Sequence, residues 1–135
     1  MSYIMNYKKL ILHDSNIDNN NMEISTNTMN TLENEYYVGD NLDHLKELPD
    51  NSVDFIYFDP PYNTGRNFFN FDDKFKSVED YLEFIKLRVV ECERCLKPNC
   101  NIVIHIEPKI SHYFRVICDE IFGLGNFKNE IVWQT

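Results

Sequence analysis

The stretch "VDFIYFDPPYNTG", Val53–Gly65, decides what kind of fold this chain adopts. Its first six residues are nearly all apolar, which is typical of a strand in a parallel sheet that is covered on both faces. Pro60 and Pro61 must end this strand because proline has no N–H to donate to a strand ladder. The sequence therefore predicts a buried strand that stops on a stiff corner, with Asp59 before the prolines and Tyr62 after them.

The residues before this strand predict a strand, a helix and a turn. "YYVGD" (36–40) is short and apolar and stops at a glycine, as a strand does. In "NLDHLKEL" (41–48), leucines recur every three residues, which indicates a helix, and Asn41 is expected to cap it. "PDNS" (49–52) has the composition of a turn.

The residues after the corner predict a long loop over 63–77 and then a helix. Ser77 is a suitable N-cap, and the helix is expected to end near "KPNC", where Asn99 can take the left-handed conformation. Phenylalanines are frequent in the loop and are expected to pack it; they are Phe68, Phe69, Phe71 and Phe75. The helix carries one apolar stripe, formed by Val78, Tyr81, Leu82, Ile85, Val89 and Cys92.

The remaining segments continue the alternation of strands and helices. "NIVIHI" (101–106) is expected to be a buried strand, 110–122 a helix ended by "FGLGN", and "EIVWQ" (130–134) a further strand. Strands that alternate with helices predict an α/β fold with a doubly wound, mostly parallel sheet and right-handed crossovers. Because ligands bind at the carboxyl ends of parallel strands, Asp40, Asp59 and the end of 101–106 should share one functional rim.

Residues 1–34 differ from the rest of the chain. Their second half is rich in Asn, Ser and Thr and shows no sustained apolar period. Such a segment buries too little surface to offset its ordering entropy, so it is expected to be a disordered or loosely ordered leader. A short helix or strand within residues 3–13 is compatible with this composition. The catalytic domain is expected to occupy residues 35–135.

Composition and charge narrow the function classes. Hydrophobic residues make up 43% of the 135 residues, which is sufficient for a packed core, and the net charge is −9. Proteins that grip a nucleic-acid backbone are usually basic, so this chain alone is a poor free-standing DNA binder. It has no apolar run of transmembrane length and no convincing signal peptide, so no membrane partner and an intracellular location are expected.

Four cysteines leave two interpretations. "CERC" with Cys100 or His105 could ligate zinc, but structural zinc sites usually show two paired ligand groups and only one is present. Alternatively, Cys92 and Cys95 are small core residues on one helix face. The second interpretation is favoured, and no metal is expected.

The corner at 59–62 has a specific hydrogen-bonding character. Pro60 and Pro61 fix their own backbone and offer only carbonyl acceptors, to which Asp59 adds carboxylate oxygens. Tyr62 adds a flat ring. Rigid acceptors beside an aromatic ring suit an exocyclic amine on a planar heterocycle, although a turn with Asp59 as a simple cap would use the same residues.

The sequence around this corner resembles the amino-group DNA methyltransferases that methylate adenine at N6. Residues 36–75 resemble the amino-terminal catalytic region of the β-class enzymes, especially the modification subunits of type III restriction systems. "CLKPNCNIVIHIE" and "IFGLGNFKNEIVWQT" resemble the segments that follow it. Asn99 and Cys100 stand where a glycine is common. The resemblance implies a partial Rossmann-like methyltransferase fold, S-adenosylmethionine as cofactor and double-stranded DNA as substrate.

The resemblance also implies roles for individual residues. Asp59 and the carbonyl of Pro60 would accept the hydrogens of the adenine amine, with Pro61 holding the corner and Tyr62 stacking on the flipped base. Rotating the base out of the duplex costs a few kcal/mol, and stacking returns about 1–3 kcal/mol. Asp59 would also border the cofactor.

Further positions carry weaker implications. Asp40 matches the cofactor-adenine contact of the family or is merely a helix N-terminal charge, and the two interpretations have equal weight. Asn63, Thr64 and Gly65 would shape the substrate loop. Arg66 would meet a phosphate or remain a solvated loop arginine.

One family element is missing from this chain. The glycine-rich "FxGxG" turn that holds the methionine end of the cofactor follows a strand and opens a helix, whereas "FGLGN" (122–126) follows a helix. In β-class enzymes the true turn comes after the target recognition region. The chain is therefore expected to be the front half of a circularly permuted methyltransferase, inactive alone, with a complementing polypeptide or a restriction subunit as partner. One alternative is a non-catalytic remnant or protein–protein interaction module that keeps the fold, and another, with weaker support, is an RNA adenine methyltransferase.

Overall fold

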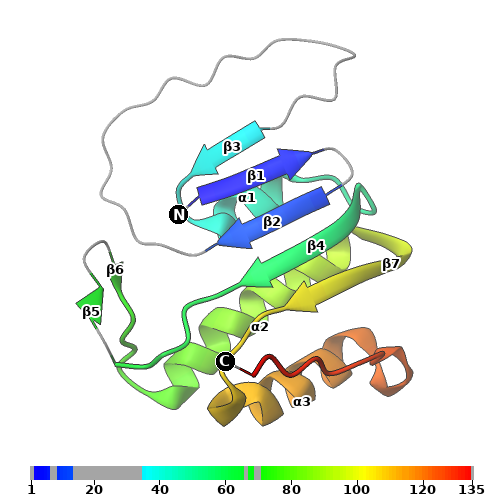
Figure 1. Ribbon diagram of the computed structural model, residues 1–135. Coiled ribbons are helices and arrows are strands. Elements are labelled where there is room, and N and C mark those ends of the chain that lie inside the picture. Colours follow the sequence, from blue (N-terminus) through cyan, green and yellow to red (C-terminus); the bar gives the residue numbers. More distant parts are fainter. Residues whose placement is uncertain (1, 7–8, 14–34, 66, 69–70, 135) are drawn as a thin grey trace.

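A computed structural model describes residues 2–6, 9–13, 35–65, 67–68 and 71–134. Its centre is a five-stranded sheet in the order β3-β1-β2-β4-β7 (Figure 1). The strands are β1 (Ser2–Asn6), β2 (Lys9–His13), β3 (Glu35–Val38), β4 (Val53–Asp59) and β7 (Leu96–Ile104). The helices are α1 (Asn41–Glu47), α2 (Val78–Cys95) and α3 (Ser111–Phe122). An α/β fold is thus confirmed.

The sheet is mostly parallel. β2 pairs with β4 and β4 with β7 in parallel, whereas β1 runs antiparallel to both of its neighbours. Because β1 is antiparallel to both β2 and β3, β3 runs in the same direction as β2, β4 and β7. The carboxyl ends of β2, β3, β4 and β7 therefore lie at one edge of the sheet, three from the expected alternation and one from the amino-terminal hairpin.

The start of the chain contributes two strands to the sheet. β1 and β2 form a hairpin that lies between β3 and β4 (Figure 1). The expected short strand within residues 3–13 is present, so this part of the predicted loose leader is instead placed in the sheet. The Asn-rich residues 14–34 lie outside the described residues.

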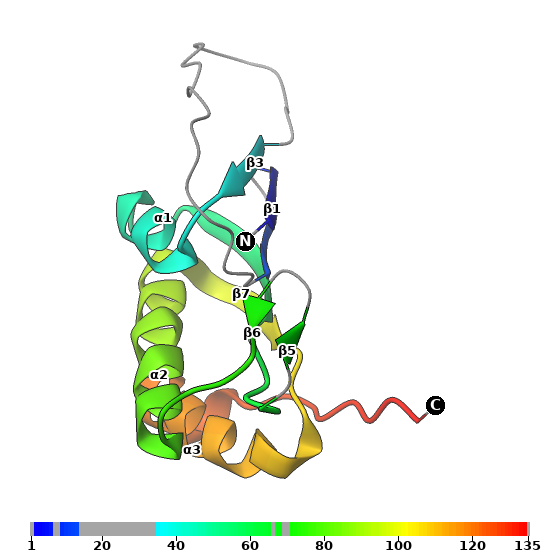
Figure 2. The ribbon, with the colours of Figure 1, turned by 90° about the vertical axis from the view of Figure 1, so that its left-hand side faces the viewer.

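Helices pack on one face of the sheet. Figure 2 shows α1 and α2 on the same side, and α3 packs beside α2. Ile56 and Phe58 of β4 are buried on this face, and they join Tyr81, Ile85 and Phe114 in one core cluster. A doubly wound arrangement needs helices on both faces, and the described part of the chain does not show it.

Side chains fix the starts of α1 and α2. The Ser77 hydroxyl accepts the N–H of Asp80, so the predicted cap of α2 is confirmed. The cap of α1 is Asp40 rather than the expected Asn41, which is buried as the first helical residue. Asp40 has the extended backbone that an N-cap requires, and its carboxylate accepts the N–H of Leu42.

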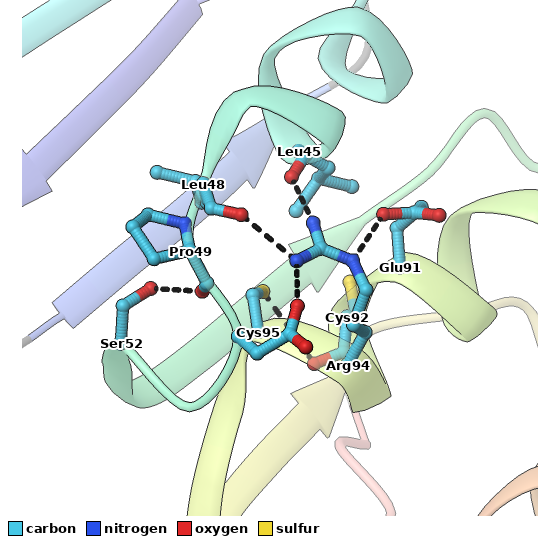
Figure 3. A network of polar contacts seen from close by, with 9 residues as sticks. Leu45, Leu48, Pro49, Ser52, Glu91, Cys92, Arg94 and Cys95 are labelled. Atoms are coloured by element: carbon cyan, nitrogen blue, oxygen red, sulfur yellow. Dashed lines mark hydrogen bonds and ion pairs between the residues drawn. The ribbon is translucent and has the colours of Figure 1, made fainter.

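The joint between α1 and α2 is held by Arg94 (Figure 3). Its guanidinium donates to the carbonyl oxygens of Leu45 and Leu48, both at 2.8 Å, and pairs with Glu91 and Asp50. Both carbonyls lie at the carboxyl end of α1, where helical N–H donors run out, and the Leu45 carbonyl also accepts the Leu48 N–H at 3.1 Å. One side chain on α2 thus caps the end of α1.

One predicted boundary and one predicted strand were wrong. α2 ends at Cys95 and β7 begins at Leu96, so the strand starts before Pro98, although Asn99 has the expected left-handed backbone (φ 63°). "EIVWQ" (130–134) is not a strand, and Ile131, Val132 and Trp133 are exposed. A strand requires a neighbouring strand to satisfy its backbone groups, and none in the described chain pairs with this segment.

The segment after the corner contains a small ribbon. β5 (Asn67–Phe68) and β6 (Phe71–Asp72) pair antiparallel within the predicted loop. Phe75 contacts the rings of Tyr81 and Phe84 edge-on, with centroids about 5 Å apart, which confirms the expected packing role at this position. Phe69 lies outside the described residues. No helix in the described ranges combines the length and apolar character needed to cross a membrane.

Candidate active site

The proline corner is anchored to helix α2. β4 ends at Asp59, Pro60 is buried, and the Tyr81 hydroxyl donates to the Pro61 carbonyl at 2.9 Å. Burial, with the nearby Asp73 carboxylate, raises the pKa of Tyr81, so this hydroxyl remains a donor. The two proline rings therefore restrict the backbone of the corner, and the hydrogen bond from Tyr81 ties it to α2.

Asp59 and Tyr62 contact one another directly. The Tyr62 hydroxyl donates to Asp59 Oδ1 at 2.6 Å, and the Asp59 side chain is 22% exposed. Burial and then the bond to Asp59 raise the pKa of Tyr62, which keeps the phenol protonated. The predicted acceptor and the predicted aromatic side chain are thus adjacent, joined by a bond that the sequence did not indicate.

The loop that follows the corner, residues 63–65, is organised by a buried carboxylate. Asp73 is 2% exposed and accepts hydrogen bonds from the N–H groups of Asn63 and Thr64 and from the Thr64 hydroxyl, at 2.6 to 2.9 Å. The Gly65 N–H donates to the Asp73 carbonyl at 2.9 Å, and Asn63 Oδ1 accepts the N–H of Phe75. Both Asp73 oxygens thus accept hydrogen bonds from the loop, which tie Asn63 and Thr64 to Asp73.

Asn63 and Gly65 have backbones that suit this turn. Their φ angles are 55° and 72°, in the left-handed region that asparagine and glycine tolerate best. The structure thus brings Asn63, Thr64 and Gly65 together beside Asp59 and Tyr62. Arg66 lies outside the described residues, and its predicted role stays a prediction.

Asp40 lies at the end of β3 and is held by Arg88. The Arg88 guanidinium is 3% exposed and donates to Asp40 Oδ1 and Asn41 Oδ1, both at 2.7 Å. It also lies over the Phe84 ring at 3.3 Å. The Asp40 side chain is 49% exposed, so it is oriented from the core yet open to solvent.

The two predicted cofactor positions share a rim but are not neighbours. Register places Val38, Ser2, His13 and Asp59 in one row across the sheet. Three strand spacings of about 4.8 Å separate the ends of β3 and β4, which is about 14 Å. Asp40 and Asp59 could therefore contact opposite parts of one extended ligand.

The sequence patterns did not predict a role at this site for three of its polar residues. Asp73 had no distinguishing signal among the neighbouring acids. Arg88 lies at helical spacing from Ile85 and Cys92, on the buried face of α2. Because charged residues are rarely buried without a partner, its position could have predicted an ion pair. His105 directly follows a strand end and lies 3.3 Å from Asp59, and strand alternation places it on the side of Val103.

The cysteines belong to the core. Cys92 and Cys95 are fully buried, and burial raises the pKa of Cys92 and brings that of Cys95 to about 11. Within the described residues, no group of three or more His, Cys, Asp or Glu is arranged to hold a metal.

Comparison with known proteins identifies the family of this chain. The family model described as DNA methylase matches residues 53–135. The chain is 35% identical over 107 residues to type II methyltransferase M.KpnI of Klebsiella pneumoniae, covering 71% of this chain. It is 34% identical over 97 residues to the DNA adenine methyltransferase YhdJ of Escherichia coli, again covering 71% of this chain.

A relative from a type III system also matches. The StyLTI Mod subunit of Salmonella typhimurium is 31% identical over 129 residues and covers 73% of this chain. The matches span 25%, 31% and 20% of M.KpnI, YhdJ and the StyLTI Mod subunit, respectively. The family model covers more than half of the chain and carries the whole corner from β4 onward. The chain therefore belongs to the DNA methylase family.

Proposed function

We propose that this chain is the catalytic front half of a site-specific DNA adenine-N6 methyltransferase that uses S-adenosylmethionine. The observation that carries the proposal is the pairing of Asp59 with Tyr62 on an immobilised corner at the carboxyl edge of the sheet. The name of the relative YhdJ, a DNA adenine methyltransferase, supports adenine as the substrate. Residues 35–135 would form the first part of a Rossmann-like, doubly wound catalytic domain.

The residues of the corner account for activation of the amine. The Asp59 carboxylate and the Pro60 carbonyl accept the two hydrogens of the adenine amine, which favours a tetrahedral nitrogen whose lone pair points at the methyl group. On taking up a methyl group the amine would release one proton, which Asp59 or solvent would accept. No covalent bond to the protein is required.

The chain offers part of a cofactor site. S-adenosylmethionine, when bound, supplies a methyl group activated on a sulfonium sulfur. The exposed Asp40 carboxylate, oriented by Arg88, fits the hydroxyl or amine donors of the nucleoside end, and Asp59 borders the methyl end. "FGLGN" forms the end of α3 and a short 3-10 turn, so it does not serve as the cofactor glycine turn. A second polypeptide segment is expected to supply that turn.

The substrate loop and its partners complete the proposal. Asn63, Thr64, Gly65 and Arg66 would line the entry for the flipped base in double-stranded DNA, and Tyr62 would stack on it. The type III Mod name of one relative supports a restriction subunit as a further partner.

Methyl transfer tests the proposal. The chain is mixed with the polypeptide that carries the remaining catalytic segments, with duplex DNA and with methyl-labelled S-adenosylmethionine. Label should enter adenine N6, and Asp59→Ala should reduce the rate by at least a hundredfold, because the amine loses its charged acceptor. Glu93→Gln, on the exposed face of α2, is the control and should leave the rate unchanged.

Two results would count against this function. Full activity of Asp59→Ala would remove Asp59 from the chemistry. Failure of the mixture to bind S-adenosylmethionine or to methylate any duplex would favour a non-catalytic remnant of the family. The isolated chain is expected to be inactive in both cases, so the mixture is the informative sample.

A further inference from the structure

His105 is fixed beside the Asp59 carboxylate by the backbone. Its N–H donates to the Phe58 carbonyl at 2.9 Å, which continues the β4–β7 ladder one residue past the end of β7. This places His105 opposite Asp59, on the same side of the sheet as Tyr57 and Val103. The imidazole is 55% exposed, so its orientation depends on polar contacts more than on packing.

Three polar atoms meet at this point. Tyr62 Oη lies 2.6 Å from Asp59 Oδ1 and 3.0 Å from His105 Nδ1, and His105 Nδ1 lies 3.3 Å from Asp59 Oδ1. The Tyr62 and His105 rings are close to perpendicular, at 73°. The two residues are 43 positions apart in the sequence, so only the sheet brings them together.

The hydrogens of this cluster can be assigned from its chemistry. A phenol has a single hydrogen, and the carboxylate at 2.6 Å is the stronger acceptor, so Tyr62 donates to Asp59. A lone pair on His105 Nδ1 would then face the lone pairs of two oxygens. Nδ1 must therefore carry a hydrogen, which it donates to the Tyr62 oxygen and partly to Asp59.

We propose that His105 is a positioning residue of this site: it holds the Tyr62 hydroxyl while Asp59 exchanges that hydroxyl for the amine of the substrate. The inference rests on the proposed function. In the present arrangement Tyr62 occupies an oxygen of Asp59 that the adenine amine would need. When the amine arrives, the hydroxyl keeps its bond from His105 Nδ1, so the Tyr62 ring remains in place to stack on the base.

The tautomer of His105 tests the proposal in this chain without DNA. Long-range proton–nitrogen NMR spectra distinguish a protonated Nδ1 from a protonated Nε2. We expect the neutral His105 ring to carry its hydrogen on Nδ1 and Tyr62→Phe to shift it toward Nε2, while the His112 signals stay unchanged. A hydrogen on Nε2 in the unsubstituted chain, or no response to Tyr62→Phe, would overturn the assignment.

A double-mutant cycle in the methyl-transfer mixture tests the role. His105→Ala should lower kcat/KM about three- to tenfold, the worth of one hydrogen bond, mainly through a higher KM for DNA. In a Tyr62→Phe background it should cause no further loss, because the hydroxyl it holds is already absent. His105→Asn, whose amide N–H reaches a position similar to Nδ1–H, should restore most of the activity.

Controls separate this inference from the function on which it rests. His112→Ala, exposed on α3, should leave kcat/KM unchanged. Losses that add independently in the double variant, or no rescue by asparagine, would show that His105 acts otherwise. If Asp59→Ala remains fully active, the proposed function fails, whereas the NMR result still decides whether His105 and Tyr62 form this bond.

Discussion

Asp73 illustrates how one buried side chain can determine a loop. Three donors from Asn63 and Thr64 converge on its two oxygens, and none of them belongs to a helix or a strand ladder. Burying a carboxylate is costly unless such bonds satisfy it, so the bonds and the burial depend on each other. The conformation of residues 63–65 beside Tyr62 is therefore a consequence of Asp73.

Asp73→Asn is expected to loosen this loop. The amide keeps one acceptor but turns its NH2 group toward the donors of Thr64, so at least one buried donor loses its partner. The free energy of unfolding should fall by about 1 to 3 kcal/mol, measured by urea denaturation. Glu93→Gln, an exposed acid-to-amide change, should alter it by less than about 0.5 kcal/mol. Equal stability of both variants would mean that Asp73 does not hold the loop.

Side chains also fix the short helix α1 to the long helix α2. α1 has only seven residues, too few to be stable in isolation, and it depends on contacts with α2. Arg94 supplies them at the carboxyl end through Leu45 and Leu48, and Arg88 supplies them at the amino end through Asp40 and Asn41. The short helix is thus fixed at both ends by arginines of the long one.

Arg94→Lys should destabilise this joint while keeping the charge. An ammonium group cannot reach both carbonyls and both carboxylates that the planar guanidinium bridges. We expect a loss of about 1 to 3 kcal/mol in the free energy of unfolding. Arg115→Lys, in a surface i,i+4 pair with Asp119, should cost about 0.5 kcal/mol or less. A similar small cost at Arg94 would contradict the capping role.

Buried thiols in the core are expected to make the free energy of unfolding fall at alkaline pH. Burial raises the pKa of Cys95 and of Cys118 from 9.0 to about 11. The folded state thus favours the neutral thiol more than the unfolded state does. This contribution is fully present below pH 9 and is lost as the pH rises through about 11.

Cys95→Ala should weaken this pH dependence. Between pH 8.5 and 11, the unsubstituted chain should lose on the order of 2 kcal/mol through Cys95, a loss that alanine cannot show. Comparing each protein with itself at the two pH values removes the constant cost of the smaller side chain. Parallel stability curves for the two proteins would show that Cys95 does not titrate in this way.

Local patterns predicted much of the chain because their causes are local. The apolar run before Pro60, the period of α2, the Ser77 cap and the left-handed Asn99 all follow from neighbouring residues, and each is present in the structure. The strand end at Asp59 was located in the same way, since two prolines stop a strand, whereas the catalytic roles of Asp59 and Tyr62 stay predictions. The end of α2 and the cap of α1 were misplaced by one to a few residues because adjacent polar residues compete for these positions.

Contacts between distant residues could not be predicted from such patterns. Asp73 accepts a hydrogen bond from Asn63, ten positions earlier in the sequence. Tyr62 and His105 are 43 positions apart, and Arg88 and Asp40 are 48 positions apart. The amino-terminal hairpin between β3 and β4 and the unpaired segment 130–134 likewise depend on which strand edge is open. The order of residues thus determined the elements and the chemistry of the corner. The folded arrangement decided its partners, because hydrogen bonds and strand pairing depend on distance in space, which local periodicity does not encode.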